Sequence, residues 1–95
     1  MTRTGGAVLP AGWTLEEIRD VSGDRGAVPL DTDRVVTGWP DQDERLRPEI
    51  VLDFHGLCIV KAADDPLWYM GSLTEDGSVI CWSIYDDLHE ALRGL

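Results

Sequence analysis

The chain has 95 residues, of which 43% are hydrophobic, and its formal net charge is −10. This length predicts a single domain, and the hydrophobic content argues against intrinsic disorder despite the charge. Eighteen acidic residues against eight basic ones argue against direct binding to nucleic acid or to anionic membranes, because too little positive charge is present to neutralise phosphate groups.

The residue composition also bears on origin and compartment. Lys61 is the single lysine beside seven arginines, and asparagine is absent, a bias that indicates a bacterial genome of high GC content. The N-terminal residues lack the apolar core of a signal peptide, and no stretch has the length of a membrane span. We therefore expect a cytoplasmic protein in which Cys58 and Cys81 are buried, reduced thiols. A disulfide would require the two cysteines to lie on neighbouring strands in matching register.

The first part of the chain predicts a flexible lead-in over residues 1–12 and then a short helix. Thr14 and Glu17 have the spacing of a capping box, and Leu15, Ile18 and Val21 follow at helical spacing. The same region also fits a strand, because residues 13, 15 and 17 would share one face.

Residues 22–48 are expected to be irregular. The segment Val35–Thr37 is β-prone but short, and glycine and proline follow it. Residues 41–45 are polar and predict a solvated loop. A connection of this length in a small domain is usually functional or mobile.

Residues 49–85 predict an antiparallel β-meander. Apolar residues alternate over 50–54, and the segment 57–62 is apolar on both faces, which is typical of a central strand. His55-Gly56 fits a two-residue turn that places Phe54 opposite Leu57, and Asp76-Gly77 marks a second hairpin. The expected strands are 50–54, 57–62, 67–73 and 78–85.

Residues 86–94 predict an amphipathic helix, capped by Ser83 or Asp86 and carrying one apolar stripe. The stripe consists of Leu88, Ala91, Leu92 and Leu95. It requires burial, and the apolar face of the meander is available. The predicted fold is therefore α+β: an antiparallel β-meander of four to five strands packed against a short C-terminal helix, with a short N-terminal helix as an additional element.

The residues that could support catalysis or metal binding do not form a recognisable motif. His55, Cys58, Cys81 and His89 have the right types for zinc, but their spacing matches no zinc site. The adjacent carboxylates Asp64-Asp65 and Asp86-Asp87 do not share a face, so they fit a turn and a helix cap better than acid–base catalysis. We expect no metal, no cofactor and no enzymatic activity.

The four tryptophans are the second notable feature of the composition. Trp68 and Trp82 belong to one predicted hairpin and are expected to stack across it. Trp13 and Trp39 lie outside the clear strands, which favours exposed anchors for a partner, since tryptophan is enriched at interface hot spots. The predicted partner-binding residues are Trp13, Trp39, Asp41, Asp43, Glu44, Asp64 and Asp65.

The segment Trp68–Leu73, followed by Asp76-Gly77 and Cys81-Trp82, resembles sequences of small bacterial immunity-type proteins. The charge, the tryptophans outside the core pattern and the lack of a catalytic motif favour a non-enzymatic inhibitor or immunity protein that blocks a basic partner such as a toxin or nuclease. A homodimeric structural or regulatory module is the second hypothesis. A small-ligand or enzymatic site within residues 22–48 is a third.

Overall fold

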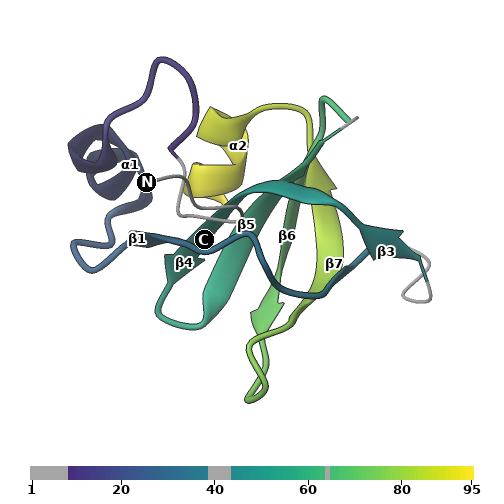
Figure 1. The fold of residues 1–95 in the computed structure, drawn as a ribbon. Helices are drawn as coiled ribbons and strands as arrows, with labels where there is room; N and C mark the ends of the chain where they lie inside the picture. Colours follow the sequence, from purple (N-terminus) through teal and green to yellow (C-terminus); the bar gives the residue numbers. More distant parts are fainter. Residues whose placement is uncertain (1–8, 39–43, 64) are drawn as a thin grey trace, which may run out of the picture.

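The computed structural model describes residues 9–38, 44–63 and 65–95. In chain order its elements are α1 (Leu15–Ser22), β1 (Val28–Leu30), β2 (Val36–Thr37), β3 (Arg45–Leu46), β4 (Pro48–Phe54), β5 (Leu57–Ala62), β6 (Trp68–Leu73), β7 (Val79–Tyr85) and α2 (Leu88–Arg93). The strands form one seven-stranded sheet in the order β1-β4-β5-β6-β7-β2-β3, rolled into a half-barrel (Figure 1). β2 runs parallel to β7, and the other pairs are antiparallel. The fold is therefore α+β with a mixed sheet and two short helices.

The sequence predicted a meander of four to five strands, which is wrong in extent because the sheet has seven strands. β4 to β7 do follow one another as antiparallel neighbours, but β1, β2 and β3 extend this sheet on both sides. All three come from the segment 22–48, which was expected to be irregular. Each has only two or three residues, too few to produce the alternation by which a strand is recognised in a sequence.

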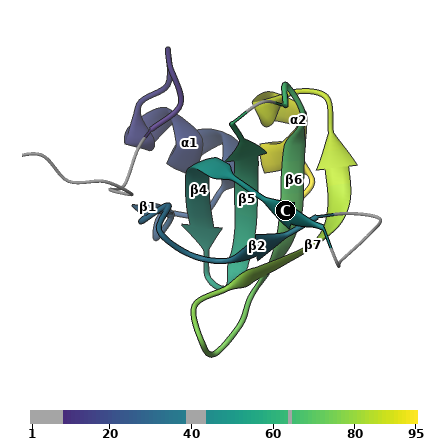
Figure 2. The same cartoon turned by 45° about the vertical axis from the view of Figure 1, so that its right-hand side comes forward.

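A bend at Arg47 closes one end of the half-barrel. Arg47 alone separates β3 from β4, yet β3 pairs with β2 while β4 pairs with β5. The Arg47 carbonyl accepts a hydrogen bond from the Ala63 amide at 2.8 Å, so pairing with the β5 side begins directly at the bend. Such bends allow a strand to change its partner at the corner of a rolled sheet. Figure 2 shows β2 crossing beside β7 on this side of the barrel.

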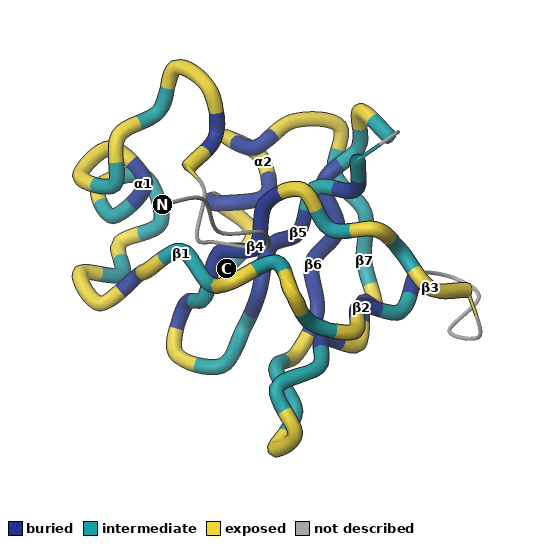
Figure 3. The backbone as a smooth tube through the Cα atoms, in the orientation of Figure 1, coloured by how far each residue is buried: buried dark blue, intermediate teal, exposed yellow. Residues whose placement is uncertain are grey.

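The central strands β4, β5 and β6 are coloured mostly as buried in Figure 3. Their buried residues face two sides of the sheet and form two separate cores. The core under the helices consists of Ile18, Ala27, Ile50, Leu52, Phe54, Ile59, Trp68, Met70, Leu88, Ala91 and Leu92. The core inside the half-barrel consists of Val36, Val51, Cys58, Val60, Ala62, Tyr69, Val79 and Cys81. β5 contributes alternate residues to both, which confirms the expectation that it is a central strand.

The capping box of α1 is present, so the helical interpretation of this region is confirmed. The Thr14 hydroxyl accepts from the Glu17 amide at 3.1 Å, and the Glu17 carboxylate accepts from the Thr14 amide at 2.9 Å. Ile18 on the inner face is fully buried. The helix thereby covers the core at the β1–β4 side of the sheet.

α2 buries the predicted apolar stripe, but its cap differs from the expectation. Asp87, rather than Ser83 or Asp86, accepts the Glu90 amide at 2.8 Å. Leu88 and Leu92 are buried in the core under the helices. The helix is therefore held by its stripe against β6, β7 and α1.

Two local features fix the hairpins. At the β4–β5 turn, His55 and Gly56 have φ values of 56° and 97°, and Phe54 lies opposite Leu57 as predicted. Between β6 and β7 the register shifts, because Met70 pairs with Ser83 while Gly71 pairs with Cys81. A Cβ atom at Gly71 would lie 2.2 Å from the Ile80 carbonyl oxygen, so this bulge requires glycine.

Replacing Leu92 with alanine tests the packing of α2. Leu92 is 1% exposed, so the substitution should lower the free energy of unfolding by about 2–4 kcal/mol through lost contacts and a residual cavity. Urea denaturation measures this change. The variant His89→Ala, on the exposed side of the same helix, should change the stability by about 0.5 kcal/mol or less. Equal stabilities of the two variants would contradict the packing.

Candidate functional site

Three of the seven predicted partner-binding residues, Trp13, Glu44 and Asp65, lie in the part of the chain that the structure describes. Trp13 is partly buried and packs against the core under the helices, so it is not a free anchor. Glu44 and Asp65 lie together in a shallow hollow at the β3–β4 corner, beside Tyr69. The remaining predicted positions, Trp39, Asp41, Asp43 and Asp64, lie outside the described residues.

Asp65 is engaged in local structure. Its carboxylate accepts the Tyr69 hydroxyl at 2.6 Å and the Leu67 amide at 2.9 Å. The hydrogen bond from Tyr69 and that from the amide lower the pKa of Asp65. In return, the Asp65 carboxylate and burial raise the pKa of Tyr69 to about 12. Asp65 therefore holds the turn before β6 and the rim of the half-barrel in place.

The two cysteines lie in one row across three strands, with Gly71 between them. Cys58 on β5 and Cys81 on β7 are each directly opposite Gly71 on β6. Their Cα atoms are thus about 9–10 Å apart, two strand spacings, which is too far for a disulfide. Both thiols are free and fully buried. No cluster of three metal-ligating side chains occurs among residues 9–38, 44–63 and 65–95.

Burial makes both thiols poor nucleophiles. It raises the pKa of Cys81 to about 12, and burial together with the Asp53 carboxylate raises the pKa of Cys58 to about 12. The Cys58 Sγ lies 3.9 Å from Asp53 Oδ1, in a position to donate its proton to that carboxylate. Cys58 is therefore an interior side chain, and its nearness to His55 in the sequence does not make it an activated nucleophile.

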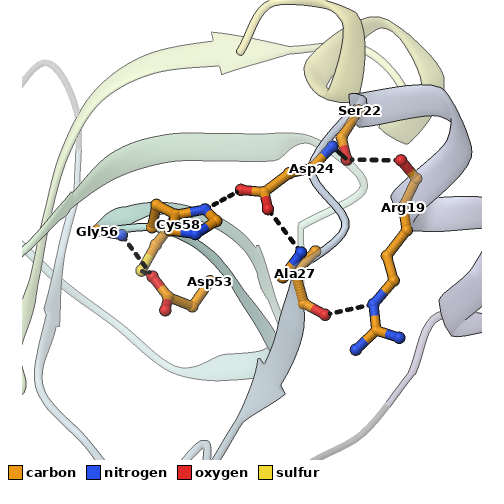
Figure 4. Close-up of polar contacts among 9 residues, drawn as sticks. Arg19, Ser22, Asp24, Ala27, Asp53, Gly56 and Cys58 are labelled. Atoms are coloured by element: carbon orange, nitrogen blue, oxygen red, sulfur yellow. Dashed lines mark hydrogen bonds and ion pairs between the residues drawn. The ribbon is translucent and has the colours of Figure 1, made fainter.

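The most developed polar cluster joins the α1–β1 loop to the β4–β5 hairpin. His55 Nδ1 lies 2.6 Å from Asp24 Oδ2, and the other carboxylate oxygen accepts the Gly26 amide at 2.8 Å. The Ser22 hydroxyl accepts the Asp24 amide at 3.1 Å, so the loop itself is fixed. Figure 4 shows Asp24 between the end of α1 and the hairpin residue Gly56. From the tip of its turn, His55 thus connects the hairpin to this loop.

A shallow hollow of about 630 Å³ adjoins this pair. Phe54, Leu57 and Leu95 supply its apolar wall, and the Asp24–His55 pair lies on its rim. The His55 side chain is 76% exposed, whereas that of Asp24 is 16% exposed. The hollow could admit a side chain of a partner, but the exposed imidazole lacks the enclosed surroundings typical of catalytic groups.

The expected stacking of Trp68 and Trp82 does not occur. Trp68 lies opposite Tyr85 and is buried, because the bulge at Gly71 shifts the register of the hairpin. Trp82 falls at the bulge and is 43% exposed. Its indole Nε1 donates to the Ser72 hydroxyl at 3.1 Å.

Ile80 lies on the same outer side of β7 and is 38% exposed, while its neighbours Val79 and Cys81 are fully buried. This exposed apolar surface was not predicted from the sequence. One signal in the sequence could have indicated it: the segment 78–85 carries large apolar residues on both faces of the strand. The core buries only one of these faces, so apolar side chains on the other face remain exposed.

Comparisons with protein-family models, with curated proteins and with solved structures found no match to this chain. Within the part of the chain that the structure describes, neither helix has the length and apolar character needed to cross a bilayer.

Thiol reactivity tests the placement of the cysteines. Native protein should react with the disulfide reagent DTNB on the order of a thousandfold more slowly than an exposed thiol, because both burial and a raised pKa suppress the thiolate. The variant Glu75→Cys, in the exposed β6–β7 turn, provides the reference thiol. Denaturant should abolish the difference. Rapid labelling of Cys58 or Cys81 in the native protein would contradict this arrangement.

The Asp24–His55 pair should make stability depend on pH. Hydrogen bonding to Asp24 raises the pKa of His55 above its ordinary value of 6.5, and the hydrogen bond from His55 lowers that of Asp24 below 3.8. The contribution of His55 to folding stability is complete below pH 6.5 and is lost as the pH rises through its raised pKa. The contribution of Asp24 to folding stability is complete above pH 3.8 and is lost as the pH falls through its lowered pKa.

His55→Asn is the matched variant, because asparagine also tolerates positive φ. Between pH 6 and pH 9, the wild type should lose stability relative to this variant in thermal melts. An NMR titration of the His55 ring should give a pKa above 6.5 that falls in Asp24→Asn. Titration of His55 at the same pH in both proteins would disprove the pairing.

Proposed function

We propose that this protein is a non-enzymatic binding protein that occupies the cationic site of a basic protein partner, in the manner of an inhibitor or immunity protein. The net charge of −10 is the observation that carries the proposal. A strongly negative field attracts and orients a cationic partner and repels nucleic acid.

The contacts of the basic side chains support this proposal. Arg25 pairs with Asp20, and Lys61 pairs with Glu49, so these cations are offset by the protein's own carboxylates. Arg19 and Arg34 donate to backbone carbonyls. Their guanidinium groups are thus held in place by local structure, while the chain as a whole remains acidic.

Features of the interior and of the hollow support a binding role over catalysis. The cysteine thiols are buried and protonated, and the Asp24–His55 pair connects two segments of the backbone at an open surface. The homodimer alternative has less support from the sheet edges, because the edge strand β1 contains Pro29 and β3 has only two residues. Short edges and proline discourage pairing of sheets between molecules.

Affinity capture at two salt concentrations tests the proposed function. The immobilised protein should retain a basic protein from the proteome of its source organism at 50 mM salt and release most of it at 500 mM, because salt screens charge attraction. The retained protein, once purified, should lose its own activity when the acidic chain is added in equimolar amount. Capture that is insensitive to salt, or a partner whose activity is unchanged, would count against the proposal.

A further inference from the structure

We propose that the outer side of β7 is the docking surface for the basic partner, and that it receives a partner segment in which an apolar side chain is flanked by arginine or lysine. This inference rests on the proposed function and specifies where the partner binds. The β7 outer surface is defined here by Val35, Thr37, Ser72, Ile80 and Trp82.

The register of the sheet places these residues side by side. Ile80 lies directly opposite Ser72 on β6 and opposite Thr37 on β2. Val35 precedes the inward-facing Val36, so strand alternation directs it outward with Thr37. Three strands therefore contribute to one continuous face.

The apolar side chains of this face serve neither core. Trp82, Val35 and Ile80 are 43%, 43% and 38% exposed, and all three are absent from both core clusters. The inward positions of the same strand, Val79 and Cys81, already fill the half-barrel. Trp82 and Ile80 are therefore free to contact a partner, and the hydrogen bond from the Trp82 indole to Ser72 holds the ring in a defined position. A rigid, partly exposed tryptophan is a typical hot-spot anchor.

The surface continues into the hollow beside the β4–β5 hairpin. Ser72 lies opposite Leu57 on β5, and Leu57 lines that hollow with Phe54. A partner side chain could enter the hollow while a neighbouring one rests on Trp82. The combination of a flat aromatic area and an adjacent depression gives the face a shape that an extended or helical segment can follow.

Charges at the opposite end specify the chemistry of the partner. A notch between the β1–β2 loop and the β6–β7 turn brings Asp33 and Asp76 next to Val35. Hydrogen bonds from the Thr74 and Ser78 hydroxyls lower the pKa of Asp76 to about 2, so this carboxylate is ionised at neutral pH.

Arg34 in the same notch donates to the carbonyl oxygens of Asp31 and Gly77, at 2.6 and 2.7 Å. On the far side of Thr37, Arg45 lies beside Glu44. At the rim of this apolar face, the carboxylates of Asp33, Asp76 and Glu44 outnumber the guanidinium groups of Arg34 and Arg45, so the face complements apolar and cationic groups presented together. A second copy of this chain would instead bring two acidic molecules together, so we assign the surface to a basic partner.

Peptide titration of the isotope-labelled protein provides the test. Three synthetic peptides of equal length are compared by NMR: one with Trp and Leu between Arg and Lys, one with the apolar residues replaced by Ser, and one with the basic residues replaced by Glu. The first should shift the Trp82 indole N–H and the amides of Ile80 and Thr37. The other two should bind about tenfold or more weakly.

Variants identify the contribution of the surface. Trp82→Thr and Ile80→Thr should each weaken binding of the first peptide by about tenfold. Val28→Thr is the matched control, because Val28 is 38% exposed but lies on β1 at the far edge of the sheet. The affinity of this variant for the first peptide should remain within about twofold of the wild type. Circular dichroism and thermal melts establish that each variant folds. If Trp82→Thr does not fold, Ile80→Thr alone provides the test of the surface.

Each other outcome has a distinct meaning. Equal binding by the Trp82, Ile80 and Val28 variants would overturn the docking surface while leaving the salt-dependent capture, and thus the proposed function, intact. No shift with the basic peptide up to millimolar concentration would overturn the surface in the same way. Equal affinity for the acidic peptide would overturn the assignment of a basic partner. A dimer in sedimentation that Trp82→Thr abolishes would assign the surface to a second copy.

Discussion

Burial of β5 on both faces is the constraint on which the structure depends. Its residues alternate between two apolar directions, so a single covering layer cannot protect them from water. On one side, α1 and α2 supply the cover. On the other, the sheet covers itself by rolling, and the bend at Arg47 lets the chain pair with β2 before it and β5 after it. Helices and short strands are thus two solutions to the same requirement.

The parts of the fold that could be predicted are those specified by neighbouring residues. The His55-Gly56 turn fixed the pairing of Asp53 with Cys58, and the spacing of Thr14 and Glu17 specified the start of α1. β1 and β3 could not be recognised, because two or three residues carry no period, whereas the β-prone segment Val35–Thr37 does contain β2. The presence of a helix over 86–94 was likewise foreseen, although its cap lies at Asp87.

The candidate site was harder to predict, because exposure depends on register. Trp68 and Trp82 look equivalent in the sequence, yet the bulge opposite Gly71 turns one inward and leaves the other at the surface. Trp13 was predicted to be an exposed anchor, but its side chain is partly buried and packs against the core under the helices. The contact between Asp24 and His55 joins positions 31 residues apart and has no local signature. The acidic character of the protein was evident from its composition alone. The position at which exposed apolar and acidic side chains adjoin could be found only from the structure.

The path of the chain from β1 to β3 has a consequence for the order in which the molecule assembles and opens. β4 to β7 are joined by short hairpins and can form from local contacts, whereas Arg34 and Gly77, where the strap of residues 31–37 meets the β6–β7 turn, are 43 positions apart. Closing such a distance carries a larger entropic cost, and a contact of this kind tends to form late and to release early. Val36 of this strap is buried in the same core as Cys58 and Cys81. If the strap separated first, this core would lose Val36 while β4 to β7 stayed paired, so the accessibility of the two thiols would report partial unfolding of the protein.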